Sequence, residues 1–418
     1  MEPSHIEEYV DSLKDLERYD EAAVKLVSIV NNHKFQSVRG KSHYQLWQDL
    51  CELVVDHCQD VTSLQVEPII RSGIKRFTDQ VGMLYCRLAM YWIKMGQLEK
   101  ARDIFEEGIT TVLTVRDFTA IFDAYAEFEE EMITTKMEMA AEREESGEKD
   151  PEEDLDLDLR LLRFERLMDR RPFLVNDVLL RQNPNNALEW EKRVALWGNN
   201  KEKVVETYTR AVQTINPKKV HGKFQQLYIK FAKFYEEGGD LASARAIFDK
   251  AVKVNYKNVN DLAEVWCEYA EMEVRHDEFD KALDVMARAT VTPRIPGVNP
   301  KVINFNDDTL PVQARVFKSL TLWSFYVDLE ESVGTVESTK SVYDKIMDLR
   351  IVNPQIVVNY AKFLEENNYF EDSFRVYERG IEIFGWPIAF ELWNIYLERF
   401  MKRYVSIKNI EQLQLLLL

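Results

Sequence analysis

The feature that most constrains this chain is a short pattern that recurs along most of its length. "LASARAIFDKAVK", residues 241–253, has near-copies in "LEKARDIFEEGIT" from Leu98, "VESTKSVYDKIMD" from Val336 and "FEDSFRVYERGIE" from Phe370. The shared pattern is small-x-x-aliphatic-aromatic-acidic-basic-small. Internal repeats decide the fold class more strongly than any isolated motif.

A second pattern precedes the first at a fixed distance. An aromatic residue is followed by another three positions later and by a large or acidic residue four further on, as in Trp266, Tyr269 and Glu273. The first small residue of the later pattern, here Ala282, lies 16 positions after the leading aromatic. The same interval joins Tyr85 to Ala101, Tyr228 to Ala244 and Trp323 to Thr339. Unrelated amphipathic helices would not keep a constant interval, so the two patterns form one unit.

Ten units start at Ile6, Trp47, Tyr85, Phe122, Trp190, Tyr228, Trp266, Trp323, Val357 and Trp393. Most starts are 34 to 41 residues apart, but the intervals after Phe122 and Trp266 are 68 and 57 residues. These long intervals predict an acidic insertion at 130–158 and a proline-containing one at 290–311. Because the repeat resumes in phase behind each, we expect a single array over residues 1–418.

Each unit has the periodicity of two helices. Positions i, i+3 and i+7 share one helix face, so Ala244, Ile247, Phe248 and Ala251 form one apolar stripe. Between the halves, "EEGGDLAS" supplies a glycine pair to end the first helix and Asp240 to cap the second. One helical hairpin cannot bury such a stripe alone, whereas stacked copies can. The sequence therefore predicts an all-α superhelical solenoid of tetratricopeptide-like hairpins.

Opposite charges lie four residues apart in the second half of several units. Such i,i+4 pairs contribute only a few tenths of a kcal/mol each. The pairs predicted in this way are Arg102 with Glu106, Arg245 with Asp249, and Lys340 with Asp344.

The motif residues have two interpretations. The aromatic residues could be stacking platforms for single-stranded nucleic acid, but their fixed place in the repeat favours the core. The residues predicted to build the repeat core are Tyr85, Ala101, Tyr125, Trp190, Tyr228, Ala244, Phe248, Trp266, Tyr269, Ala282, Trp323, Tyr326, Tyr343, Tyr360, Tyr377 and Trp393.

The repeat resembles a known family. "ARAIFDKA" at 244–251 and "ARDIFEEG" at 101–108 resemble the half-a-tetratricopeptide (HAT) repeat, which is typical of RNA-processing scaffolds. Longer stretches that the HAT pattern does not require, above all "FTDQVG" and "VLLRQNP", are similar to the SYF family of pre-mRNA-splicing factors, which contains XPA-binding protein 2. This resemblance runs from about Ile6 to Phe400.

The resemblance implies a non-catalytic scaffold of the spliceosome in the nucleus. It also implies partners in the nineteen complex, including the crooked-neck HAT protein and the Aquarius helicase group, a link to transcription-coupled DNA repair, and longer relatives with further HAT repeats. Two alternatives remain open at this point. One is a HAT scaffold of another assembly, such as that of mRNA 3'-end cleavage, and the other is a single-stranded RNA-binding module.

Composition narrows the function classes. The net charge of -18, from 54 basic and 72 acidic side chains, disfavours broad nucleic-acid binding and leaves RNA contact indirect or local. No apolar run approaches the roughly 20 residues that cross a bilayer. The four cysteines are scattered, which favours a reduced intracellular compartment, and Cys51, His57 and Cys58 lack metal-ligand spacing. With no phosphate-binding or nucleophile motif either, we expect no enzyme activity, cofactor, metal or membrane contact.

Three segments are candidates for partner contact. "MDRRPFLVNDVLLRQNP" holds the best local basic cluster, Arg170, Arg171 and Arg181, although the first two are expected just after a helix end, where cations suit the helix dipole. The insertion at 290–311 has four prolines and two apolar residues, Ile303 and Phe305, that helix stacking is not expected to bury.

The third candidate segment is the acidic tract. "AEREESGEKDPEEDLDLD", residues 141–158, has ten acidic residues against two basic ones. Such a tract is either a solvated, mobile insertion or a docking site for a basic partner. Its composition favours disorder.

Overall fold

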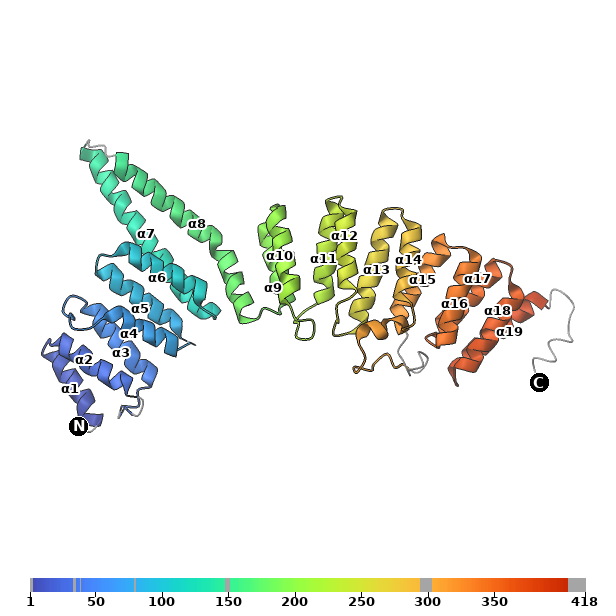
Figure 1. Cartoon of the computed structure of the whole chain (residues 1–418), viewed down its shortest axis with the longest axis horizontal. Coiled ribbons are helices and arrows are strands. Elements are labelled where there is room, and N and C mark those ends of the chain that lie inside the picture. The colour runs from blue at the N-terminus through green and yellow to red at the C-terminus, as the bar shows by residue number, and fades with distance from the viewer. Residues whose placement is uncertain are drawn as a thin grey trace. The chain divides into compact units, whose positions relative to one another are not determined.

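The computed structural model describes most of the chain, namely residues 3–32, 35–37, 39–78, 80–146, 151–293 and 303–404. All regular secondary structure in these ranges is helical, with nineteen α-helices and two short 3-10 helices and no strand (Figure 1). The predicted all-α fold of stacked helical hairpins is therefore confirmed.

The first compact unit is Met1–Thr207. Its helices pack as successive hairpins, each against the next. They are α1 (Pro3–Asp15), α2 (Tyr19–Asn31), α3 (His43–Asp56), α4 (Val66–Arg76), α5 (Val81–Lys94), α6 (Leu98–Thr111), α7 (Val115–Ser146), α8 (Pro151–Gln182) and α9 (Ala187–Trp197). α7 and α8 have 32 residues each and extend past α6 as a long hairpin (Figure 1).

The second compact unit is Tyr208–Leu418, and the boundary falls inside α10 (Lys201–Thr214). The sequence predicted one array, but each hairpin of a repeat protein packs only on its neighbours, so a run of repeats can form more than one compact unit. The remaining helices are α11 (Phe224–Glu237), α12 (Leu241–Ala251), α13 (Val259–Arg275), α14 (Phe279–Ala289), η2 (Val312–Ala314), η3 (Val316–Lys318), α15 (Leu320–Val333), α16 (Val336–Leu349), α17 (Pro354–Glu366), α18 (Phe370–Ile383) and α19 (Ile388–Tyr404).

All ten predicted unit starts lie in odd-numbered helices, which are the first helices of the hairpins. The turn chemistry agrees with the sequence. Gly239 follows α11 with φ +80°, a left-handed conformation that glycine adopts without a Cβ clash. The side chain of Asp240 then accepts a hydrogen bond from the backbone N–H of Ser243 at 3.1 Å and caps α12.

Aromatic side chains join one repeat to the next. The aromatic in the second helix of a unit stacks on the second aromatic of the following unit, with the rings 4° to 10° from parallel in three such pairs. The ring centroids are 5.1 Å apart for Phe105 and Tyr125, 5.0 Å for Phe248 and Tyr269, and 4.4 Å for Tyr343 and Tyr360. Fifteen of the sixteen predicted core residues are buried, and Trp393 is half-buried. The stripes are therefore occupied by inter-repeat packing.

The expected disorder of the acidic insertion at 130–158 is wrong for the residues that the structure describes. Residues 130–146 continue α7 and residues 151–158 begin α8, while 147–150 lie outside the described residues. Pro151 opens α8, and Glu152, Glu153 and Asp154 occupy its first turn. Proline suits the first helical position, and carboxylates there interact favourably with the helix dipole, so this composition initiates a helix.

Candidate protein-interaction surfaces

A buried ion pair recurs between repeats. The Arg102 guanidinium on α6 donates two hydrogen bonds to the Glu129 carboxylate on α7, the one from Nη2 at 3.2 Å. In the second unit, Nε and Nη2 of Arg245 on α12 donate to Glu273 on α13 at 2.7 Å each. Both arginines follow the first small motif residue, and both glutamates are the acidic residue of the next unit. The polar motif residues thus lock neighbouring hairpins together.

This pairing corrects the predicted i,i+4 pairs. Arg102 and Arg245 reach across to the next hairpin, and Lys340 pairs with Asp372. A cross-repeat carboxylate that is buried needs a cationic partner, whereas an exposed carboxylate one turn away is satisfied by water. The carboxylates left over pair with other helices, Glu106 with Arg170 and Asp249 with Arg288.

The predicted basic cluster is used within the first unit. Arg170 and Arg171 do not follow a helix end, because α8 continues through Pro172 to Gln182. Arg170 forms a 2.6 Å ion pair with Glu106 on α6. Arg171 lies 3.5 Å from Asp123 and 5.1 Å from the centre of the Phe122 ring on α7. These contacts fasten α8 to the two preceding helices.

Arg181 closes the end of α6. Its Nε and Nη2 donate to the carbonyl oxygens of Val112 and Ile109 at 3.2 and 3.4 Å. Burial, partly offset by the charge of Asp177, lowers the pKa of Arg181. The last carbonyls of a helix lack partners within it, so Arg181 serves as a cap supplied by another helix.

The described part of the second insertion, residues 303–311, packs against the second unit rather than standing free. Ile303 is only 3% exposed, so the expectation that helix stacking leaves it uncovered is wrong. Phe305 is half-buried, and its carbonyl oxygen accepts a 3.0 Å hydrogen bond from Nη1 of the buried Arg315. Residues 294–302 of the insertion lie outside the described residues.

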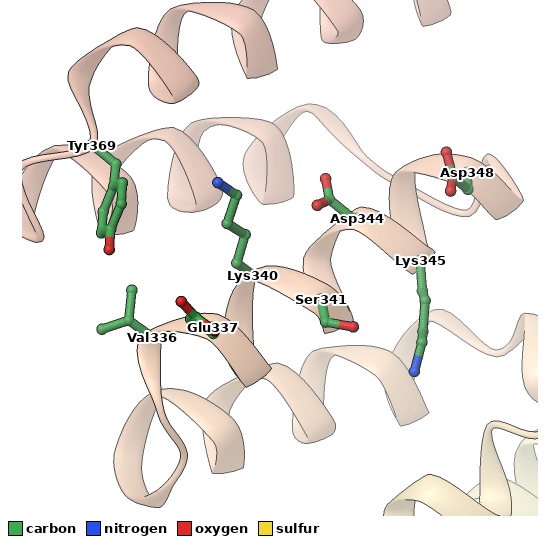
Figure 2. A pocket seen from close by; sticks show the side chains of 8 residues that line it. All are labelled: Val336, Glu337, Lys340, Ser341, Asp344, Lys345, Asp348 and Tyr369. Atoms are coloured by element: carbon green, nitrogen blue, oxygen red, sulfur yellow. The ribbon is translucent and has the colours of Figure 1, made fainter.

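An open groove of about 510 Å³ runs along α16 to the residue before α18 (Figure 2). Its charges are matched by neighbours. Lys340 pairs with Asp372 and lies 5.4 Å from the centre of the Tyr369 ring, and Arg379 donates to Asp344 at 2.9 Å. The arrangement holds α16 and α18 together and presents no nucleophile beside a base.

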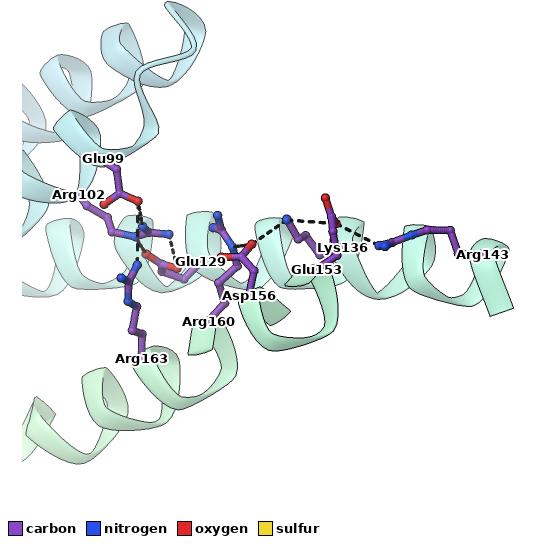
Figure 3. Close-up of polar contacts among 9 residues, drawn as sticks. All are labelled: Glu99, Arg102, Glu129, Lys136, Arg143, Glu153, Asp156, Arg160 and Arg163. Atoms are coloured by element: carbon purple, nitrogen blue, oxygen red, sulfur yellow. Dashed lines mark hydrogen bonds and ion pairs between the residues drawn. The ribbon is translucent and has the colours of Figure 1, made fainter. Parts of the chain in front are cut away.

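The outer part of the α7–α8 hairpin is held by an ion-pair seam, which we define as Lys136, Arg143, Glu153, Asp156 and Arg160 (Figure 3). Lys136 lies 2.7 Å from Asp156, Arg143 lies 3.0 Å from Glu153, and Arg160 lies 2.9 Å from Asp156. Hydrogen bonds from Lys136 and Arg160 lower the pKa of Asp156 to about 2. Charged rather than apolar side chains therefore join the two helices here.

Within the described ranges, no group of three or more histidine, cysteine, aspartate or glutamate side chains is placed to hold a metal ion. Burial raises the pKa of the Cys51 thiol to about 12, so this cysteine stays protonated and unreactive at neutral pH.

A search of the helices in the described part of the chain finds none with the length and apolar character needed to cross a membrane.

Comparison with known proteins identifies the family. Residues 6–215 match the family model described as "Pre-mRNA-splicing factor SYF1 middle HAT repeat", and residues 217–416 match "Pre-mRNA-splicing factor Syf1/CRNKL1 C-terminal HAT repeat". The chain belongs to the SYF1 family of pre-mRNA-splicing factors. The two SYF1 models meet close to the boundary between the two compact units.

Full-length SYF1 relatives extend the match. The chain is 56% identical to pre-mRNA-splicing factor syf1 of Aspergillus fumigatus over 99% of its length and 49% of the relative's. It is 53% identical to SYF1 of Homo sapiens over 97% of its length and 46% of the relative's. This SYF1-family chain thus spans about half the length of these relatives. Among solved structures, yeast Tom70 aligns over 97% of this chain and 98% of its own, but at 12% identity and a TM-score of 0.27, too distant to bear on function.

Proposed function

We propose that this chain is a non-catalytic scaffold in pre-mRNA splicing. The observation that carries the proposal is the match to two SYF1 HAT models from residue 6 to residue 416. The match favours a splicing assembly over the 3'-end cleavage machinery. Repeat arrays expose much surface for their length and commonly work by contact.

The internal chemistry supports a role through contact. The motif aromatics are occupied by stacking between repeats, and the motif arginines by buried glutamates. The side chains that remain on the surface are those outside the motif, and these differ from repeat to repeat. Different hairpins can therefore bind different partners while they share one packing scheme.

The resemblance to the SYF family supports partners within the nineteen complex, namely the crooked-neck HAT protein and the Aquarius helicase group, and a nuclear location. It also supports a link to transcription-coupled repair. We propose that contact with RNA is indirect or local, because the net charge of -18 repels a phosphate backbone. Phe305, at the rim of the second insertion, stays a candidate contact.

The test is immunodepletion from nuclear extract followed by rescue. Depletion should leave introns unspliced and release several nineteen-complex proteins together, because each contacts a different repeat. Wild-type protein should restore both. A variant with the exposed charges of α16 exchanged, Glu337→Lys with Lys345→Glu, keeps the net charge and should lose at most one partner. Normal splicing with intact particles after thorough depletion would refute the scaffold function.

A further inference from the structure

The outer part of the α7–α8 hairpin carries apolar side chains on its surface. We call residues 130–146 of α7 and 151–162 of α8 the arm, because the contacts of Glu129 with Arg102 and of Arg163 with Glu99 are the last that these helices make with α6 (Figure 3). Seven large apolar residues of the arm and its base are at least 40% exposed: Met137, Met139, Leu155, Leu159, Leu161, Leu162 and Met168. Single exposed leucines are ordinary, but a group on one element indicates a contact surface.

Three of these leucines form a stripe. At about 100° per residue, Leu155, Leu159 and Leu162 fall within about 60° of one another on α8. The seam residues of α8 are centred roughly 125° away, so the stripe faces away from α7. The arm therefore places charges between its two helices and leucines on its outer face. This is the reverse of the usual amphipathic arrangement, and it leaves a helix-length apolar surface uncovered.

Acidic side chains border the stripe. Asp158 and Asp154 lie on one side of it and Glu152 on the other, and all three are exposed. The structure shows no ion pair for Asp154 or Asp158 in the described part of the chain. A partner that covered the leucines would bring its own flanking side chains next to these carboxylates, where cations are favoured and anions are repelled.

We propose that the outer face of α8 in the arm binds a helix of a partner protein whose apolar stripe is flanked by lysine and arginine. A helix fits because the leucines at i, i+4 and i+7 follow one helix axis over two turns. The surrounding carboxylates disfavour RNA. They also disfavour a second copy of this chain, because two identical arms would place like charges together. The inference rests on the proposed scaffold function only in that both act through contact.

The test uses the intact chain and a synthetic probe. The probe is a fluorescein-labelled amphipathic peptide of about five helical turns with leucines at i, i+4 and i+7 and lysines on both flanks. A matched peptide carries glutamate in place of each lysine. Fluorescence anisotropy should show saturable binding of the lysine peptide, weakened by added salt, and no comparable binding of the glutamate peptide.

Two variants assign the binding to the arm. Leu155→Ser with Leu159→Ser and Leu162→Ser should weaken binding of the lysine peptide at least tenfold, because truncated central anchors typically cost that much. Leu113→Ser with Leu188→Ser is the control, since both leucines are at least as exposed as two of the stripe residues but lie outside the arm. It should bind like wild type. Equal helicity by circular dichroism ensures that both variants are folded.

Three results would overturn the inference. Unchanged binding by the triple variant would move the site off the stripe. Equally tight binding of the glutamate peptide would remove the role of the acidic border. A leucine-dependent dimer seen by light scattering would make a second copy the occupant. Each of these outcomes leaves the splicing result of depletion and rescue unaffected, so failure of the arm site and failure of the scaffold function are distinguishable.

Discussion

Replacing Arg102 by methionine tests whether the cross-repeat ion pair holds adjacent hairpins together. Methionine retains much of the apolar stem of arginine but leaves the Glu129 carboxylate without its cation. The two side chains are 8% and 3% exposed, so water cannot easily take the place of the guanidinium. Opening of the contact between α6 and α7 should therefore become much easier.

The size of the effect follows from burial. Removing one partner of a buried ion pair typically costs about 3–5 kcal/mol, because an uncompensated charge is left behind. At about 1.4 kcal/mol per factor of ten, local opening should become roughly 100 to 3,000 times more frequent. The double variant Arg102→Met with Glu129→Met removes both charges and should regain most of the loss, since a buried pair replaced by apolar side chains is often neutral in stability.

Native-state hydrogen exchange followed by mass spectrometry measures this opening. Peptides from α6 and α7 should lose protection in the single variant and regain it in the double variant. Peptides from α12 and α13, which hold the equivalent Arg245–Glu273 pair, are the internal reference and should not change. If the double variant exchanges as fast as the single one, the lost packing of Arg102 rather than the orphaned charge is responsible, and the reasoning is wrong.

Two further changes probe the core and the arm. Trp323 is 1% exposed, so Trp323→Ala should destabilise the second unit by about 3–5 kcal/mol in thermal unfolding, whereas Trp393→Ala, at a half-buried site, should cost clearly less; equal losses would contradict the burial argument. The pKa of Asp156, lowered by Lys136 and Arg160, stabilises the fold above pH ~4 and loses this effect as pH falls toward 2. The difference in Tm between wild type and Asp156→Asn should therefore shrink over that range, and a constant difference would exclude this cause.

The sequence alone predicted the helices and their faces. A hairpin needs a stop signal, a cap and an apolar stripe, and all three are local patterns of a few residues. Gly239 and Asp240 therefore marked the turn between α11 and α12, and the 16-residue interval placed the motif residues in the two helices. The stretches "FTDQVG" and "VLLRQNP" pointed to the SYF family, which the comparisons confirm.

The acidic tract shows where composition misled. A run of carboxylates favours disorder when it is taken as an average over a window. The structure decides otherwise because the cations Lys136, Arg143 and Arg160 meet Glu153 and Asp156 across and along the hairpin. Lys136 and Arg143 belong to the other helix, and only the antiparallel packing of α7 and α8 brings them to these carboxylates.

Partner choice was likewise decided by tertiary structure. Periodicity brings a residue next to those three and four positions away, so it offered Glu106 to Arg102. The structure instead brings Glu129, 27 residues along the chain, because the next hairpin packs over the small motif residue Ala101. It also turns Ile303 inward and directs Arg181 to the carbonyls at the end of α6. The sequence determined which faces are buried; the register in which hairpins stack decided which charges meet.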